Sequence, residues 1–225
     1  MKIVAVAGSP NGLSGFSGKM LEIMNTHFKK SNATLEVFTL AHLNVGTCTG
    51  CFRCVTNGNC PLNDDNATIK AAMLKADGII WLSPNYSFNV TAELKAFIDR
   101  NFTMMHRQML KGKYALPFVT SGSWVLEEPL KYLYHILQRN GCWIIDSLGI
   151  SIAEWNTVPK EKEKQLEAAA TAMLQAIVGQ KTFPEQEGQL NDYFETWKSY
   201  IQYFKDQHID EYRYWVEHWN IEEKS

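Results

Sequence analysis

The strongest constraint on the fold is an alternation of short apolar runs with amphipathic segments. KIVAVAG (2–8), GIIWLSP (78–84) and YALPFVTSG (114–122) are apolar runs that end in small or turn-forming residues. Such runs are typical of strands buried on both faces of a parallel sheet. TLEVFTL (34–40) and WIIDSLGISI (143–152) add two more expected strands. Helical patterns cover residues 16–30, 64–75, 91–104, 127–139 and 159–178. This order predicts an α/β fold, a doubly wound five-stranded parallel sheet.

The chain changes character after Gly179. Its 225 residues, 45% of them hydrophobic, suit one main domain, expected over 1–179. QKTFPEQEGQ then indicates a linker, and 180–225 forms a helical extension rich in aromatic residues. Phe194, Trp197, Ile201 and Phe204 share one helical face by their spacing. This face packs on the chain's own domain, or it covers a neighbouring subunit or the mouth of a site.

Charge and hydropathy exclude two classes of partner. A net charge of −2 lacks the positive footprint of a nucleic-acid binder. No apolar stretch approaches the roughly 20 residues that span a bilayer, and the first residues lack the pattern of a secretory leader. We therefore expect a cytoplasmic protein without nucleic-acid or membrane partners.

The loop after the first strand, GSPNGLSGFSGK (8–19), is rich in glycine and serine. Its glycines allow close backbone approach, the hydroxyls of Ser9, Ser14 and Ser17 can bind phosphate oxygens, and a helix N-terminus follows. The sequence has neither GxGxxG nor a P-loop, because Met20 follows Lys19. The loop therefore predicts a mononucleotide phosphate site, with a structural turn as the alternative.

Two further strand exits are expected beside this loop. When the strand order is 2-1-3-4-5, ligands bind where the order reverses, between strands one and three. Residues 84–89 follow the third strand and offer backbone groups and the ring of Tyr86. The small residues of TSGSW (120–124) follow the fourth strand. Together these exits favour a planar phosphorylated ligand.

CTGCFRCVTNGNCP (48–61) places Cys48, Cys51, Cys54 and Cys60 in a CxxCxxCxxxxxCP pattern. Two-residue gaps and a terminal Cys-Pro are typical of loops that hold an iron-sulfur cubane. Zinc and thiol-disulfide chemistry remain alternatives. Cys142, beside a strand, is expected to be a core residue. The acidic pair at 64 and 65 is expected to cap the helix that follows.

GSP after the first strand, CxGCxxC, SPxY with LKAFIDR, and TSG, in this order, resemble the NAD(P)H-dependent FMN reductase and flavodoxin-like superfamily. The four-cysteine loop resembles that of the iron-sulfur flavoproteins, and the resemblance covers residues 1–178. It implies a flavodoxin-like fold with FMN as the planar ligand. The implied FMN contacts are Ser9, Pro10, Ser14, Gly15, Phe16, Ser17, Pro84, Asn85, Tyr86, Ser87, Phe88, Thr120, Ser121 and Gly122. The chain departs from the family where Asn11 replaces a basic residue and Phe16–Ser17 replace an Asn-Thr pair.

These observations predict an FMN-dependent oxidoreductase that passes electrons between FMN and a [4Fe-4S] cluster on the cysteine loop, residues 48–60. The resemblance implies a homo-oligomer, a dimer or tetramer, with NAD(P)H or a ferredoxin-type protein as donor. One alternative is an NAD(P)H-dependent FMN or quinone-type reductase without a cluster. The other is a redox-sensing or zinc-stabilised binding protein.

Overall fold

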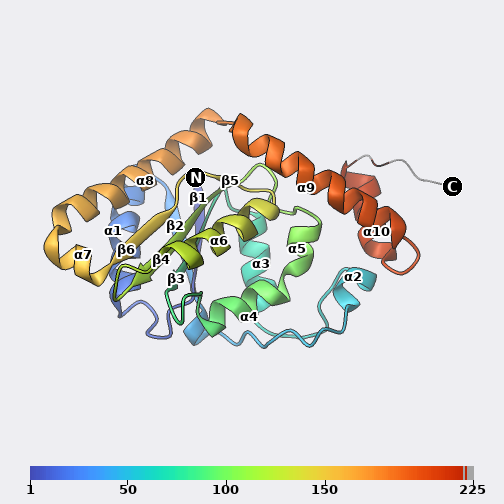
Figure 1. Cartoon of the computed structure of the whole chain (residues 1–225), viewed down its shortest axis with the longest axis horizontal. Coiled ribbons are helices and arrows are strands. Elements are labelled where there is room, and N and C mark those ends of the chain that lie inside the picture. Colours follow the sequence, from blue (N-terminus) through green and yellow to red (C-terminus); the bar gives the residue numbers. More distant parts are fainter. Residues whose placement is uncertain (220, 222–225) are drawn as a thin grey trace.

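A computed structural model describes residues 1–219 and 221. All strand pairs of its sheet are parallel, and the order is β2-β1-β3-β4-β5, with β6 also on β4 (Figure 1). The strands are β1 Lys2–Ala7, β2 Thr34–Thr39, β3 Gly78–Pro84, β4 Tyr114–Ser121, β5 Trp143–Ile144 and β6 Leu148–Ser151. The predicted doubly wound sheet of order 2-1-3-4-5 is confirmed.

The fifth position of the sheet is shared by two short strands. β5 pairs with the start of β4 and β6 with its end, so the predicted strand 143–152 is interrupted between them. At the break, the side chain of Asp146 accepts the backbone N–H of Ser147 at 2.7 Å. Local side-chain bonds of this kind compete with the backbone hydrogen bonds of a sheet, and the pairing with β4 is interrupted at this point.

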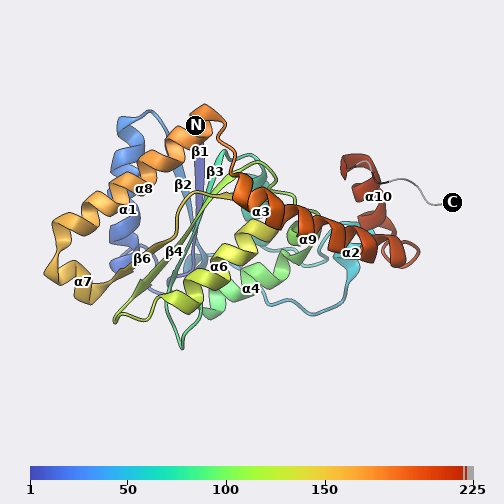
Figure 2. The ribbon, with the colours of Figure 1, turned by 45° about the horizontal axis from the view of Figure 1, so that its top comes forward.

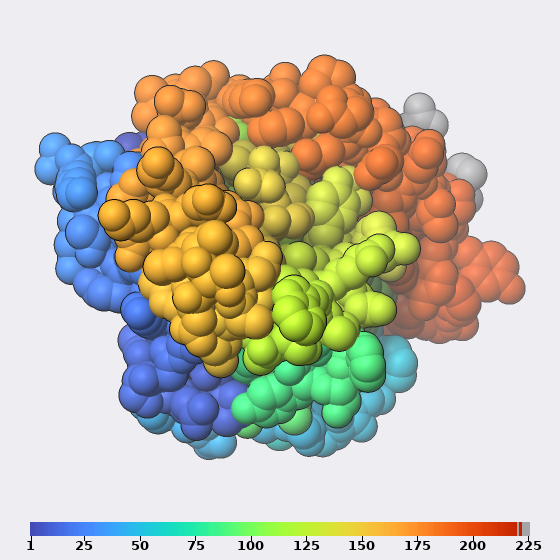
Figure 3. Space-filling model, turned by 60° about the vertical axis from the view of Figure 1, so that its left-hand side comes forward, coloured from blue at the N-terminus to red at the C-terminus, as the bar shows by residue number. Residues whose placement is uncertain are grey.

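Helices cover both faces of the sheet (Figure 2). One face carries α1 Phe16–Lys30, α7 Ile152–Thr157 and α8 Pro159–Gly179. The other carries α3 Asn66–Leu74, α4 Ala92–Arg100, α5 Phe102–His106 and α6 Glu127–Arg139. Seen from the α7 side, α7 and α8 form a broad surface beside α1 (Figure 3). The expected helix 91–104 is divided at Asn101, whose side-chain amide donates to the Phe97 carbonyl at 2.8 Å.

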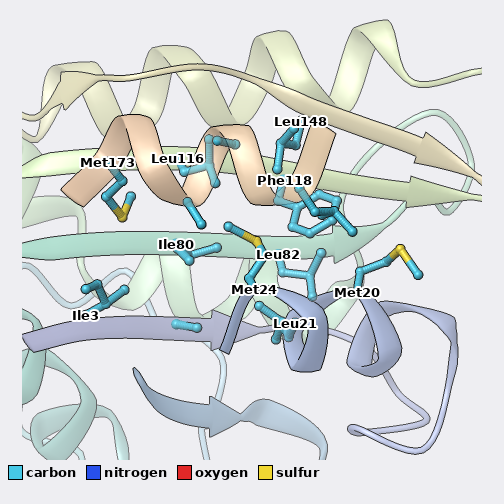
Figure 4. Packing of buried hydrophobic residues seen from close by; sticks show 14 of the residues in the cluster. Ile3, Met20, Leu21, Met24, Ile80, Leu82, Leu116, Phe118, Leu148 and Met173 are labelled. Atoms are coloured by element: carbon cyan, nitrogen blue, oxygen red, sulfur yellow. The ribbon is translucent and has the colours of Figure 1, made fainter. Parts of the chain in front are cut away.

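β1 shows why continuous apolar runs form the centre of the sheet. Ile3, Ala5 and Ala7 are buried in the cluster under α1 and α8, whereas Val4 and Val6 are buried in the cluster on the opposite face. Successive side chains point to opposite faces, so both must be apolar where helices cover both. Figure 4 shows residues of the first cluster from strands and helices meeting in one layer.

The described part of the C-terminal extension, residues 180–219 and 221, packs against its own chain. It contains α9 Pro184–Tyr203 and α10 Ile209–Trp219, and the sheet domain also has η1 Leu40–His42 and α2 Arg53–Asn57. The indoles of Trp215 and Trp219 donate to the carbonyls of His106 (3.1 Å) and Arg107 (3.3 Å). α10 lies beside α2 in both ribbon views (Figures 1 and 2). Of the predicted aromatic face, Phe194, Trp197 and Ile201 pack with Trp215 of α10, and the ring of Trp197 also lies 3.9 Å from that of His106 on α5.

The predicted linker is shorter than the sequence indicated. QKTFPEQEGQ runs from 180 to 189, but α9 already begins at Pro184. Proline suits the first turn of a helix, and Glu185 and Glu187 complement the helix dipole there. Within the described part of the chain, no helix has both the length and the apolar content needed to cross a bilayer.

Candidate functional site

The loops after β1, β3 and β4 meet at one edge of the sheet. β3 pairs with both neighbours, and the last residues align as Ala7 with Leu82 and Pro84 with Thr120. Because the strands are parallel, their carboxyl ends lie together. The structure therefore brings the three predicted loops to one edge. They contribute Ser9, Pro10, Ser14, Gly15, Phe16 and Ser17; Pro84, Asn85, Tyr86, Ser87 and Phe88; and Thr120, Ser121 and Gly122.

The first of these loops ends at an uncapped helix. Gly15 is the N-cap of α1, no side chain caps this end, and the first turn contains no acidic residue. Two of the three serines already have partners, because Ser14 donates to the Asn11 carbonyl and Ser17 shares a hydrogen bond with Thr120, both at 2.7 Å. The first-turn amides and the positive dipole end are thus the main features that suit an anion here.

Thr91, which the sequence interpretation missed, locks the first loop to the end of β3. Its hydroxyl donates to the Gly8 carbonyl at 2.6 Å and accepts from the Leu94 amide at 3.3 Å as the N-cap of α4. A Cβ on Gly8 would lie 2.7 Å from the Leu94 Cβ and 2.8 Å from the Thr91 hydroxyl. The two loops can approach this closely only because residue 8 is glycine.

Asn85 joins the loops after β3 and β4 and leaves one polar atom without a partner. Its backbone amide donates to the Thr120 carbonyl and its side-chain amide to the Val125 carbonyl, both at 2.6 Å. The side-chain oxygen is buried, and no described residue donates to it. A buried acceptor normally finds a donor, so this atom suits an N–H group of a ligand ring.

Large rings surround this edge. Tyr86 and Asn89 form an antiparallel bridge across a turn in which Ser87 and Phe88 have φ of 51° and 63°. The tight turn holds Tyr86 and Phe88 out from the sheet, 50% and 64% exposed, and Trp124 is 77% exposed. Exposed rings beside a polar cradle are suited to stacking or to contact with another surface.

The four cysteines of the loop lie around α2. Cys48 and Cys51 precede it and are exposed, whereas Cys54 within it and Cys60 after it are half-buried; none forms a disulfide. Among residues 1–219 and 221, no three metal-binding side chains converge as ligands. The four-thiolate site therefore stays a prediction. Cys142 is buried in the core, as expected.

Electrostatics nevertheless link the four thiols. The pKa of Cys54 is raised, first by burial and then by the nearby Cys60, Cys48 and Cys51. The pKa of Cys51 is lowered by hydrogen bonds from the Arg53 backbone and the Thr49 hydroxyl. Three thiols act on the fourth, so the loop brings all four into one neighbourhood.

Asp64 and Arg100 close the base of the cysteine loop. Arg100 donates to both carboxylate oxygens of Asp64, at 2.6 and 3.1 Å, and to the Gly46 carbonyl at 2.9 Å. The Gly46 amide donates back to Asp64 at 3.0 Å, and the Asn44 amide donates to Asp65 at 2.7 Å. These bonds join the two ends of the segment that carries the cysteines.

This arrangement corrects the sequence interpretation of the acidic pair. Asp65 occupies the N-cap position of α3, but its side chain makes no capping bond. Asp64 keeps one bond to the helix start, from the Asn66 amide at 3.2 Å. Burial alone would raise the pKa of Asp64, but the hydrogen bonds from Arg100, Gly46 and Asn66 lower it.

Three cationic side chains, those of Lys70, Arg100 and Arg107, lie near the cysteine loop. The Nε atoms of Arg100 and Arg107 are buried without a described acceptor. Lys70 lines a cavity of about 100 Å³ with Cys54, Cys60 and Arg100. The pKa of Lys70 is lowered by burial and by Arg107, and Cys54 and Cys60 oppose that shift. Unpartnered cationic groups beside thiols fit a negatively charged group bound through thiolates.

Known proteins share this architecture. Residues 1–157 match the family described as NADPH-dependent FMN reductase. An iron-sulfur flavoprotein of Archaeoglobus fulgidus is 33% identical over 72% of this chain and 71% of its own. One of Clostridioides difficile is 25% identical over 82% and 83%. The apo crystal structure of an NADH:FMN oxidoreductase, EmoB, superposes with a TM-score of 0.60 at 24% identity, covering 82% of this chain and 92% of the other.

A flavodoxin from the domain Archaea gives a TM-score of 0.54 at 15% identity over 79% of this chain and 99% of its own, a likeness of fold alone. The family match covers the three loops at the sheet edge and the cysteine loop together. The chain is thus a flavin-dependent oxidoreductase that belongs to the NADPH-dependent FMN reductase family and, within it, to the iron-sulfur flavoproteins.

Proposed function

We propose that this chain transfers electrons between FMN at the edge formed by β1, β3 and β4 and a [4Fe-4S] cluster on Cys48, Cys51, Cys54 and Cys60. FMN exchanges one or two electrons and a cluster exchanges one, so a chain with both can join one-electron and two-electron partners. The uncapped α1 would receive the phosphate. The unpartnered oxygen of Asn85 would accept from the ring.

One observation carries the cluster half of this proposal: the unpartnered positive charge beside Cys54 and Cys60. Burying Lys70, Arg100 and Arg107 near one another costs free energy unless negative charge lies close by. Asp64 and Asp210 pair with the two arginines. A cluster on four thiolates carries net negative charge and would balance the remainder.

Quantifying iron, sulfide and FMN in anaerobically prepared protein tests the proposal. About four iron and four sulfide per FMN, with broad absorbance near 400 nm that bleaches on reduction, are expected for a [4Fe-4S] centre. A Cys51→Ser variant should then lose donor-driven turnover, with Cys142→Ser as the matched control. Flavin bands without iron would overturn the cluster half and leave the flavin half intact.

A second function is supported by the lack of a formed metal site, because no three described ligands converge on a metal position. In that case the chain reduces a quinone-type or flavin acceptor with NAD(P)H through FMN alone. The two functions differ in the fate of the Cys51→Ser variant. It should keep full NAD(P)H-driven turnover if the thiols hold no cluster.

We also infer that the chain works as a homo-oligomer that receives electrons from NAD(P)H or a ferredoxin-type protein. Supporting this inference, Tyr86, Phe88 and Trp124 expose large apolar surface beside the flavin edge. Light scattering during gel filtration would test it, with Phe88→Asp expected to lower the mass to that of one chain. A wild-type mass of a single chain would refute it.

The division at residue 179 is likewise a proposal, with 1–179 as the flavin-binding unit and 180–225 as an appended extension. α8 ends at Gly179, and the buried hydrophobic residues of the extension form a cluster apart from the two sheet cores. A chain ending at Gly179 that still binds FMN would support this division, and one that loses the flavin would refute it.

A further inference from the structure

The cations around the cysteine loop differ in how far they are neutralised. Arg100 faces the carboxylate of Asp64 at 2.6 Å, and both side chains are almost fully buried. Arg107 faces Asp210 at 2.7 Å. No carboxylate of the described residues pairs with Lys70, although it lines the same cavity as Cys54 and Cys60. Lys70 is therefore the cation whose charge remains uncompensated there.

Lys70 is also held on a rigid element. It lies on α3, between Ile69 and Met73. These two side chains are fully buried and anchor the helix in the core on one face of the sheet. The backbone of Lys70 is therefore fixed relative to the sheet, whereas the cysteines lie on a loop that is clamped at its base by Asp64 and Arg100. Because the helix is held in place, the charge is already positioned beside the cavity and little reorganisation is needed for it to interact with a group bound there.

We propose that Lys70 supplies the positive charge that stabilises the reduced, more negative state of a cluster on the four thiolates and thereby sets its reduction potential. The inference rests on the proposed function. A cubane on four thiolates gains one negative charge when it takes up an electron, and its potential depends on the charges around it. At an effective dielectric constant of about 20, a unit charge within about 10 Å changes such an equilibrium by roughly tenfold.

Lys70→Met tests the proposal because it removes the charge and keeps most of the apolar stem. Lys70→Arg restores the charge, and Lys75→Met removes an exposed lysine at the end of the same helix. The midpoint potential of the cluster would be measured for each variant at matched iron content. For Lys70→Met we expect about a tenfold fall in the ratio of reduced to oxidised cluster, which is about 59 mV for one electron.

Lys70→Arg should return the potential to the wild-type value, and Lys75→Met should leave it unchanged. Equal potentials for Lys70→Met and Lys75→Met, with full iron in both, would overturn the proposal. A structural role for Lys70 would lower the iron content without shifting the potential of the clusters that form. The potential thus separates an electrostatic role from a structural one.

Cobalt(II) titration of the metal-free chain gives a second readout that needs no iron-sulfur cluster. Four thiolates around Co²⁺ also make a dianionic site, and its formation releases protons from the thiols. Lys70→Met should weaken Co²⁺ binding by about tenfold, and Lys75→Met should not. If wild type binds Co²⁺ in this manner but never assembles a cluster, the proposed function fails, and with it the control of a cluster potential. Weaker Co²⁺ binding by Lys70→Met would then still establish that the charge of Lys70 stabilises negative charge on the four thiolates. Indifference of Co²⁺ affinity to Lys70→Met overturns that role even where no cluster forms.

Discussion

Replacing Asp64 by asparagine should destabilise the whole chain by several kilocalories per mole. The Asp64 and Arg100 side chains are 7% and 1% exposed, and the carboxylate accepts from Arg100, Gly46 and Asn66. Asparagine removes the charge and turns an N–H group toward the guanidinium. Breaking one partner of a buried ion pair costs about 3–5 kcal/mol, because the other charge stays buried without compensation.

The chain contains a matched control on α4, the helix that carries Arg100. Lys95 and Asp99 on α4 form an ion pair at 2.6 Å, but their side chains are 47% and 46% exposed. Exposed pairs four residues apart on a helix contribute about 0.3–0.5 kcal/mol. Asp99→Asn removes the same charge from the same chain and should therefore cost well under about 1 kcal/mol.

Urea unfolding of wild type and both variants at pH 7 would measure these free energies. The buried-pair reasoning requires Asp64→Asn to lose at least about 2 kcal/mol more than Asp99→Asn. Similar losses for the two variants would refute it, and would mean that water reaches the base of the cysteine loop.

Lowering the pH should reduce the difference in the free energy of unfolding between wild type and Asp64→Asn. The pKa of Asp64 is lowered in the folded chain, despite burial, by its hydrogen bonds with Arg100 and two backbone amides. A depressed pKa contributes stability above the unfolded value and loses it as the pH falls through the folded value. The gap between wild type and Asp64→Asn should therefore be widest near neutrality and close below pH 3.8, the ordinary value for this carboxyl.

Three other substitutions probe separate parts of the molecule. Trp215→Ala deletes a fully buried indole and should cost about 3–5 kcal/mol of packing. Trp215→Ala should also make α9 and α10 sensitive to trypsin while the sheet domain stays resistant. The control Tyr203→Ala, at an 82% exposed position, should leave α9 and α10 as resistant as in wild type. Gly8→Ala places a Cβ 2.7 Å from that of Leu94 and should lower stability in urea by about 1–3 kcal/mol. Asn85→Ala should weaken FMN binding about tenfold, measured by fluorescence titration, because it removes an acceptor for the ring and the hydrogen bond to the Val125 carbonyl in the loop after β4. Unchanged affinity would exclude a contact between Asn85 and the ring.

The sheet could be predicted because its signal is local and repeated. β1 must be apolar on both faces, so its sequence alone identifies it as a central strand, and α1 and α6 begin and end where the sequence placed them. The break at Asp146 and the division of the helix at Asn101 depend on single side-chain hydrogen bonds. Hydropathy patterns carry no trace of such bonds.

The structural support of the cysteine loop could not be predicted, since its partners are far apart in sequence. Asp64 and Arg100 are separated by 36 positions, and each has an adequate local explanation as a helix-start acid and a helix-end base. Docking of α10 near α2 likewise depends on Arg107 and Asp210, which are 103 positions apart. A single sequence states which residues could pair but gives no reason to choose among them.

The two halves of the site are built from different forces, and their tolerance to mutation should differ accordingly. The flavin edge relies on an uncapped helix, on one close approach at Gly8 and on neutral side-chain hydrogen bonds such as that of Thr91 to the Gly8 carbonyl, so loss of one such bond leaves no buried charge unpaired. The cysteine loop contains little regular secondary structure, and the hydrogen bonds of Asp64 and Arg100 hold its two ends together. Loss of one buried charge at the C-terminal end of α4 should therefore loosen all four thiols together, while the flavin edge at the N-terminal end of α4 keeps its shape.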